Sequence, residues 1–138
     1  MVIHELPLTR APWQQLQQLL DQSFPLPPRD VFERVVQGSH RSQRLWIAIS
    51  SDNGCLQGLV MLSPHSKGGH LENLAVLPAA RGFGIGKALV LQLLQDSAAN
   101  RSTLISLTTR IPPFFISLGF KEVGSLGDGS VAMMQCLP

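Results

Sequence analysis

Two kinds of hydrophobic pattern alternate along the chain and predict a mixture of short strands and helices. Stretches rich in Val, Ile and Leu that are bounded by Gly, Pro, Asn or Ser are typical of strands. The predicted strands are Val2–Leu6, Arg44–Ser50, Cys55–Leu62, His70–Leu77, Thr103–Thr109, Lys121–Val123 and Val131–Leu137.

Apolar residues three and four positions apart predict the helices. One begins near Pro12, a second follows an N-cap at Asp30, and a third runs from Ile85 to Ala98. A short fourth helix starts at the proline pair Pro112-Pro113 and is closed by Gly119. Between the first two, the proline-rich segment Ser23–Pro28 either shapes a pocket wall or simply connects the helices.

The order of these elements, β-α-α-β-β-β-α-β-α-β-β, predicts an α+β fold with a mixed sheet. Asn53-Gly54 favours a tight antiparallel hairpin, and a second turn is predicted over Ser63–Gly69. Alternation along the strand that follows predicts two faces. Those faces carry His70, Glu72, Leu74 and Val76 on one side and Leu71, Asn73, Ala75 and Leu77 on the other.

The composition indicates a single globular domain over residues 1–138. With 44% hydrophobic and 14% charged residues, the chain can bury a core without disulfide support. Cys55 and Cys136 are therefore expected as reduced thiols, and their spacing predicts no metal site. The chain contains no tyrosine, which matters for its chemistry below.

A net charge of +2, with Lys and Arg scattered, favours neither nucleic acid nor a membrane surface as partner, so a small molecule is expected. Met1–Leu8 has no leader pattern, and no run of about 18 apolar residues occurs, which predicts a cytoplasmic protein. The sparse charge also suggests that apolar surface is covered in a homodimer.

A glycine-rich turn, Arg81-Gly82-Phe83-Gly84-Ile85-Gly86-Lys87, follows a strand and opens a helix. Free backbone N–H groups and the positive end of the helix dipole converge there and predict an anion site, to which Arg81 and Lys87 add charge. The spacing fits neither a dinucleotide fingerprint, which needs glycine at Lys87, nor a Walker A loop, which needs Ser or Thr at Ala88.

The pattern Val76-x-Pro78-x-x-Arg81-Gly82-x-Gly84-Ile85-Gly86 resembles the acyl-CoA-binding motif of the GCN5-related N-acetyltransferase (GNAT) family. The order of elements is similar over essentially the whole chain, and Leu118-Gly119-Phe120 resembles the family's usual end of the last helix. The resemblance implies a mixed sheet of six to seven strands, flanked by about four helices and splayed between the fourth and fifth strands. The gap is expected between His70–Leu77 and Thr103–Thr109.

The same resemblance implies acetyl-CoA as co-substrate. Its pyrophosphate is expected on backbone amides of Arg81 to Gly86 and its pantetheine beside Leu74–Val76, where a strand edge can pair with an extended chain. A backbone amide near Leu74 is expected to stabilise charge on the thioester oxygen. The implied cofactor-binding residues are Leu74, Ala75, Val76, Arg81, Gly82, Phe83, Gly84, Ile85, Gly86, Lys87 and Phe115.

Acetyl transfer to an amine needs a group that accepts the proton of the nucleophile. The resemblance implies that Glu72 stands at a position where many family members have an acidic residue. It also implies that His70 stands where some members have a catalytic glutamate. Either side chain is a candidate base, through water. The alternatives are a structural or solvated carboxylate for Glu72 and a half-exposed strand histidine for His70.

The family's usual proton donor to the thiolate is a tyrosine, and Phe115 stands at that position. Water, the substrate ammonium, Ser117 or Thr109 are the substitutes. Because a thiol has a pKa of about 8.5, the thiolate can also leave without a donor near neutral pH.

Leu107-Thr108-Thr109-Arg110, Phe114-Phe115 and Gly119-Phe120 resemble the acetyltransferase domain of N-acetylglutamate synthases. That resemblance implies an amino acid as acceptor, with Arg110 available to pair with its carboxylate. Arg29 and Arg34 are further candidates, although a surface position is favoured for both.

The sequence therefore predicts an acetyl-CoA-dependent N-acetyltransferase that acts on a small amine or amino acid by direct transfer in a ternary complex. The alternatives are a protein N-terminal acetyltransferase and a non-catalytic acyl-CoA sensor or partner subunit.

Overall fold

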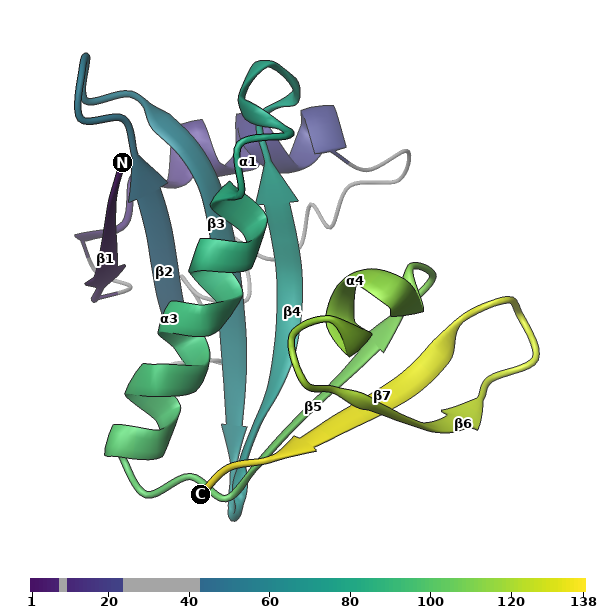
Figure 1. The fold of residues 1–138 in the computed structure, drawn as a ribbon. Coiled ribbons are helices and arrows are strands. Elements are labelled where there is room, and N and C mark those ends of the chain that lie inside the picture. Colours follow the sequence, from purple (N-terminus) through teal and green to yellow (C-terminus); the bar gives the residue numbers. More distant parts are fainter. Residues whose placement is uncertain (8–9, 24–42) are drawn as a thin grey trace.

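The computed structural model describes residues 1–7, 10–23 and 43–138. Seven strands form one mixed sheet in the order β1-β2-β3-β4-β5-β7-β6 (Figure 1). The strands are β1 (Val2–Leu6), β2 (Arg44–Ile49), β3 (Leu56–His65), β4 (Gly68–Val76), β5 (Leu104–Thr109), β6 (Lys121–Ser125) and β7 (Val131–Cys136). This architecture confirms the predicted α+β fold with a mixed sheet.

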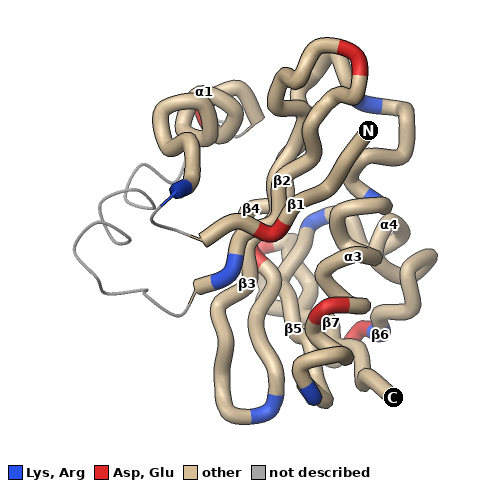
Figure 2. The backbone as a smooth tube through the Cα atoms, turned by 90° about the vertical axis from the view of Figure 1, so that its left-hand side faces the viewer, with Lys and Arg blue, Asp and Glu red and all other residues tan. Residues whose placement is uncertain are grey.

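Helices lie on both faces of the sheet, as the edge-on view in Figure 2 shows. The described helices are α1 (Trp13–Ser23), α3 (Ile85–Ala99) and α4 (Pro112–Ile116), with a 3-10 turn η2 (Pro78–Ala80). The predicted helix after Asp30 and most of the proline-rich segment lie outside the described residues. Among the described residues, no helix has the length and apolar character needed to cross a membrane.

Two hydrophobic cores, one on each face, hold the layers together. The core under α3 contains Leu89 and Leu93 together with Leu71 of β4, and all three are buried. The core under α1 contains Leu16 and Leu19, whose helical spacing carries the predicted apolar stripe. Burial of such large side chains contributes about 2 kcal/mol each relative to exposure.

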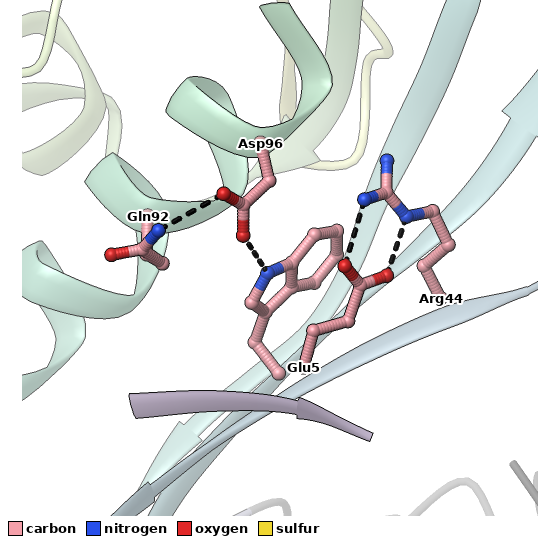
Figure 3. A network of polar contacts seen from close by, with 5 residues as sticks. Glu5, Arg44, Gln92 and Asp96 are labelled. Carbon is pink, nitrogen blue, oxygen red and sulfur yellow. Dashed lines mark hydrogen bonds and ion pairs between the residues drawn. The ribbon is translucent and has the colours of Figure 1, made fainter. Parts of the chain in front are cut away.

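A polar network ties α3 to the first strands (Figure 3). The Trp46 indole is fully buried, and its Nε1–H donates to Asp96 Oδ2 at 2.8 Å, while Gln92 Nε2 donates to the other oxygen at 3.0 Å. Arg44 stacks on the Trp46 ring at 4.8 Å and pairs with Glu5 through two hydrogen bonds, at 2.6 and 2.8 Å. The hydrogen bonds to Glu5 raise the pKa of Arg44. The C-terminal half of α3 is thus fixed to β2.

The hairpin of β3 and β4 is longer than predicted. The turn predicted over Ser63–Gly69 is present but shorter, at residues 66–67, because β3 continues to His65 and β4 begins at Gly68. Pro64 is tolerated within β3, although proline cannot donate to a ladder. The buried Gly68 is required by crowding, since a Cβ there would lie 1.8 Å from the carbonyl oxygen of Leu104.

A β-bulge breaks the predicted alternation in β4. Met61 of β3 pairs with Glu72 but Leu59 pairs with Ala75, so one extra residue stands in β4, and Asn73 has a positive φ of 57°. Leu71 packs in the core under α3, whereas Ala75 packs under α1. The prediction that Glu72 shares a face with Leu74 is therefore wrong.

The splay between the fourth and fifth strands is confirmed. β4 and β5 run parallel and pair over three residue pairs, the last of which is His70 with Ser106. Beyond that rung β5 keeps only its pairing with β7, which runs along the whole strand, and Figure 1 shows β5 diverging from β4 toward α4. The open edge of β4 from Leu71 onward gives the molecule its candidate site.

Candidate active site

A cavity of about 480 Å³ occupies the opening between β4, the N-terminus of α3 and α4. It is lined by Ser23, Leu74, Ala75, Val76, Ala80, Arg81, Gly82, Gly84, Ile85, Gly86, Lys87, Ile111 and Phe114. Because Ser23 comes from α1 and Ile85 from α3, the lining includes residues from both sides of the sheet.

The glycine-rich turn forms one end of this cavity. Gly82 and Gly84 have φ values of +87° and +80°, a conformation that L side chains rarely adopt, and a Cβ at either would meet nothing within 4 Å. Ala88 N makes the first helical bond, to Gly84 O at 3.0 Å. The amides from Gly82 to Lys87 have no acceptor within the described chain, whereas Arg81 N donates to Pro78 O. This cradle can bind an anion.

Two cations flank the cradle. Arg81 is exposed, and its Nε donates to the carbonyl oxygen of Val76 at 3.0 Å, which ties the turn to the end of β4. Lys87 is also exposed, on the first turn of α3. Neither forms an ion pair with a carboxylate in the described part of the chain, so both charges remain available to a phosphate.

The aromatic pair of α4 divides between the cavity and the core. Phe115 is buried, 5% exposed, with its ring 5.7 Å from that of Phe120. Phe114 lines the cavity instead, and a Cβ at Gly86 would lie 3.6 Å from its ring. Phe115, expected to contact the cofactor, does not line the cavity, and Phe83 is 79% exposed and does not line it either.

The two hydroxyls considered as proton donors have local partners. Thr109 Oγ1 accepts from Ile111 N at 2.9 Å, and the Ser117 hydroxyl donates to Phe114 O at 2.6 Å. Neither residue lines the cavity.

Glu72 and His70 lie two residues apart on β4, between the start of the splay and the bulge. The Ser63 hydroxyl donates to Glu72 Oε1, and His70 Nδ1 lies 2.9 Å from Ser106 Oγ. Both side chains are half-buried and neither lines the cavity, although Leu74, close behind Glu72, does. Within the described ranges, no group of three or more His, Cys, Asp or Glu could hold a metal ion.

Arg110, the expected partner of a substrate carboxylate, lies outside the cavity lining. Its guanidinium is 3.7 Å from Asp128 in the loop between β6 and β7, and both side chains are largely exposed. Hydrogen bonds from Ser130, supported by Arg110, hold the pKa of Asp128 below its ordinary value. Arg29 and Arg34 lie outside the described residues.

The residues that sequence reasoning missed are Ala80, Ile111 and Phe114, whereas Ser23 begins the segment Ser23–Pro28 that was one candidate for a pocket wall. The sequence signal for Ile111 is its position directly before the proline pair that opens α4, and in the structure its side chain is 59% exposed. No sequence signal distinguishes Phe114 from Phe115, because the pattern of a short helix does not predict which of two adjacent aromatic side chains faces the core.

Solved structures with the same fold include acetyltransferases. The chain is similar to aminoglycoside 6'-acetyltransferase type Ii at 25% identity, covering 100% of this chain and 99% of that one with a TM-score of 0.82. An aminoglycoside 6'-N-acetyltransferase complexed with coenzyme A matches at 23% identity over 100% and 98%, TM-score 0.82. The ribosomal-protein-S18-alanine N-acetyltransferase of Escherichia coli matches at 16% over 99% and 94%, TM-score 0.81.

No curated protein sequence matches the chain. The model of the acetyltransferase (GNAT) family, however, matches residues 13–120, which include the glycine-rich turn, the splayed strands and the helix with the Phe114-Phe115 pair. Since that match spans most of the chain, the protein belongs to the GNAT family of acetyltransferases.

Proposed function

We propose that the protein transfers an acetyl group from acetyl-CoA to the amine of a small molecule. The observation that carries this proposal is the glycine cradle, whose amides from Gly82 to Lys87 lack acceptors, next to the open edge of β4. A polyanion with an extended arm that contains amides fits both features. The free N–H groups of the cradle can donate to phosphate oxygens, and the open edge of β4 can pair with the amides of the arm.

The residues present fit acetyl-CoA in this role. The amides of the cradle, with Arg81 and Lys87, would hold the pyrophosphate, and Leu74–Val76 would lie along the pantetheine. Phe114 and Ile111 supply apolar surface at the other wall. When bound, acetyl-CoA would supply a thioester, and a backbone amide near Leu74 would stabilise charge on its oxygen.

Glu72 or His70 would accept the proton that the attacking amine loses, directly or through water. The amine nitrogen forms the new C–N bond as the C–S bond breaks, and the thiolate leaves and takes a proton from water or from the substrate ammonium. Cys55 and Cys136 are exposed and do not line the cavity, so direct transfer is favoured over an acetyl-cysteine route.

An amino acid is the acceptor that the residues of β5 and α4 favour, by their resemblance to N-acetylglutamate synthases. Arg110 would serve the substrate carboxylate after exchange of its exposed contact with Asp128, which at 3.7 Å and full hydration contributes little stability. A protein N-terminus is the second candidate, supported by the similarity to the S18-alanine acetyltransferase.

The proposal is tested by thiol release from acetyl-CoA with a panel of acceptors: L-glutamate and other amino acids, an aminoglycoside, and a peptide that begins with alanine. We expect turnover with amino acids, and a rate reduced at least tenfold, chiefly at low pH, in Glu72→Gln. Tight coenzyme A binding without thiol release for any acceptor would instead support the acyl-CoA sensor.

The homodimer suggested by composition forms part of the proposal. Val123, Leu126 and Met134 are exposed apolar residues on or beside β6 and β7, at the edge of the sheet. Association through this surface would cover them. Sedimentation velocity over a range of concentrations would show a dimer, and a monomer at all concentrations would contradict it.

A further inference from the structure

Polar side chains cross three neighbouring strands in one row just where β4 and β5 begin to separate. Ser63 of β3 is paired with His70 of β4, and His70 is paired with Ser106 of β5. Residues paired across adjacent strands share a face and lie side by side. Ser63, His70 and Ser106 therefore form a continuous line of polar groups, named here the serine–histidine row.

Hydrogen bonds connect the row to Glu72. The Ser63 hydroxyl donates to Glu72 Oε1, and Ser106 Oγ lies 2.9 Å from His70 Nδ1. Each serine thus engages one atom of a candidate base, and the second atom of that base, Glu72 Oε2 or His70 Nε2, has no partner in the described chain. All four side chains are half-buried, which limits competition from water.

The row lies on the face opposite α3. Met61, which pairs with Glu72, belongs to the core under α1. The residues that adjoin the row in the chain belong to the core under α3, and they are Leu62, Leu71 and Ile105. Half-buried strand positions are normally filled by β-branched or aromatic residues. Three polar positions in register, at the last rung of the parallel ladder, are not required by the fold.

We propose that Ser63 and Ser106 are positioning residues that hold Glu72 and His70 with one free acceptor atom each toward the amine. This proposal rests on the proposed function of the site. Ser63 restricts the rotation of the Glu72 carboxylate by occupying Oε1, so that Oε2 is presented for the proton. In this arrangement His70 Nδ1–H donates to Ser106 Oγ, so that Nε2 carries the free lone pair that accepts the proton.

The first experiment does not depend on turnover. Ring ¹⁵N chemical shifts of His70, measured in alkaline buffer where imidazoles are neutral, report the tautomer. We expect the Nδ1–H tautomer in the native chain and in Ser106→Thr, which keeps the hydroxyl, and a mixture in Ser106→Ala. The Nε2–H tautomer in the native chain would overturn the proposed arrangement of His70. A single unchanged tautomer in Ser106→Ala would overturn the role of Ser106.

The second experiment uses thiol release from acetyl-CoA with L-glutamate, or with the amino acid of the panel that is turned over fastest. For Ser63→Ala we expect kcat to fall about tenfold with the KM for acetyl-CoA unchanged, because only the orientation of the Glu72 carboxylate is lost. Ser63→Thr keeps the hydroxyl and should restore kcat. An unchanged kcat in Ser63→Ala, together with a large loss in Glu72→Gln, would overturn the role of Ser63.

These results separate failure of the positioning role from failure of the proposed function. If the native chain turns over no acceptor, the proposed function fails, while the His70 tautomer still decides whether Ser106 orients the ring. Thermal unfolding of each alanine variant distinguishes a local loss from a misfolded chain, and the threonine variants provide the matched folded controls.

Discussion

The two ends of β4 differ in how completely they are paired. At the paired end, Gly68–His70 has β3 on one side and β5 on the other. At the open end, Leu74–Val76 keeps β3 but has no β5 partner, and its residues line the cavity. The comparison shows that one strand provides both a segment paired on its two sides and an open edge beside the cavity, and that the change occurs within a few residues.

Helix α3 connects these two regions. Its first turn forms the glycine cradle beside the open end, and Asp96 near its other end holds the buried Trp46 of β2. The hydrogen bond between Asp96 and Trp46 fixes the C-terminal half of α3, and through the helix it helps to position the glycine cradle at the N-terminus.

The largest effect is expected from Gly68→Ala at the paired end. The added Cβ would lie 1.8 Å from a backbone carbonyl oxygen of β5, which cannot move without breaking the ladder. We expect a loss of about 3 kcal/mol in the free energy of unfolding, or about 10 °C in Tm, measured by circular dichroism. Stability equal to that of the native chain would show that β5 can shift away freely.

A smaller loss is expected from Asp96→Ala at the anchor. Removing the carboxylate leaves the indole N–H of the fully buried Trp46 without an acceptor, at a cost of about 2 kcal/mol. Urea unfolding measures it. Asp96→Asn keeps an acceptor and is the matched control, with an expected loss of less than about 1 kcal/mol. Equal losses in the two variants would contradict the assigned hydrogen bond.

The cradle is tested by Gly84→Asp. A carboxylate among amides that are proposed to hold pyrophosphate repels the ligand, and the φ of +80° disfavours any side chain. We expect the Kd for coenzyme A, by titration calorimetry, to rise at least tenfold, or about 1.4 kcal/mol. Gly127→Asp, with a φ of +82° and open space in the β6–β7 loop, should leave this Kd unchanged.

The smallest effect concerns the pH dependence of the β6–β7 turn. The pKa of Asp128 is lowered by hydrogen bonds from Ser130, so the charged carboxylate stabilises the turn above the ordinary pKa of aspartate. That contribution is lost as the pH falls through the lowered value. An acid titration followed by the amide shift of Ser130 should show this transition, and Asp128→Asn should abolish it.

The parts of the fold that sequence could predict are those fixed by local chemistry. The glycine turn was predictable because Gly82 and Gly84 supply positive φ before a helix, and Gly119, with a φ of +98°, ends α4 as expected. The splay followed from the family resemblance. The bulge at Asn73 was not predictable, because polar residues in regular alternation with apolar ones are typical of an ordinary strand.

Other features depend on partners that lie far away in the sequence. Ser63-Pro64 was interpreted as a turn, but pairing of Ser63 with His70 and of Pro64 with Gly69 extends the hairpin. Phe115 was expected beside the cofactor, but its ring packs against Phe120 and is buried, and Phe114 lines the cavity instead. Tertiary contacts determine whether a side chain points to the core or to the cavity, and local propensity does not predict this.

The bulge at Asn73 has a consequence for how this gene tolerates change. Because β4 holds one extra residue at the bulge, deletion of the Asn73 codon would restore strict alternation and leave every later residue of the strand on its present face. Leu74 and Val76 would still point toward α3, and Ala75 toward α1. In mutational scanning, an in-frame deletion of Asn73 should therefore be better tolerated than an in-frame deletion in the middle of β3, where no extra residue stands and the deletion would exchange the faces of all residues on one side of it.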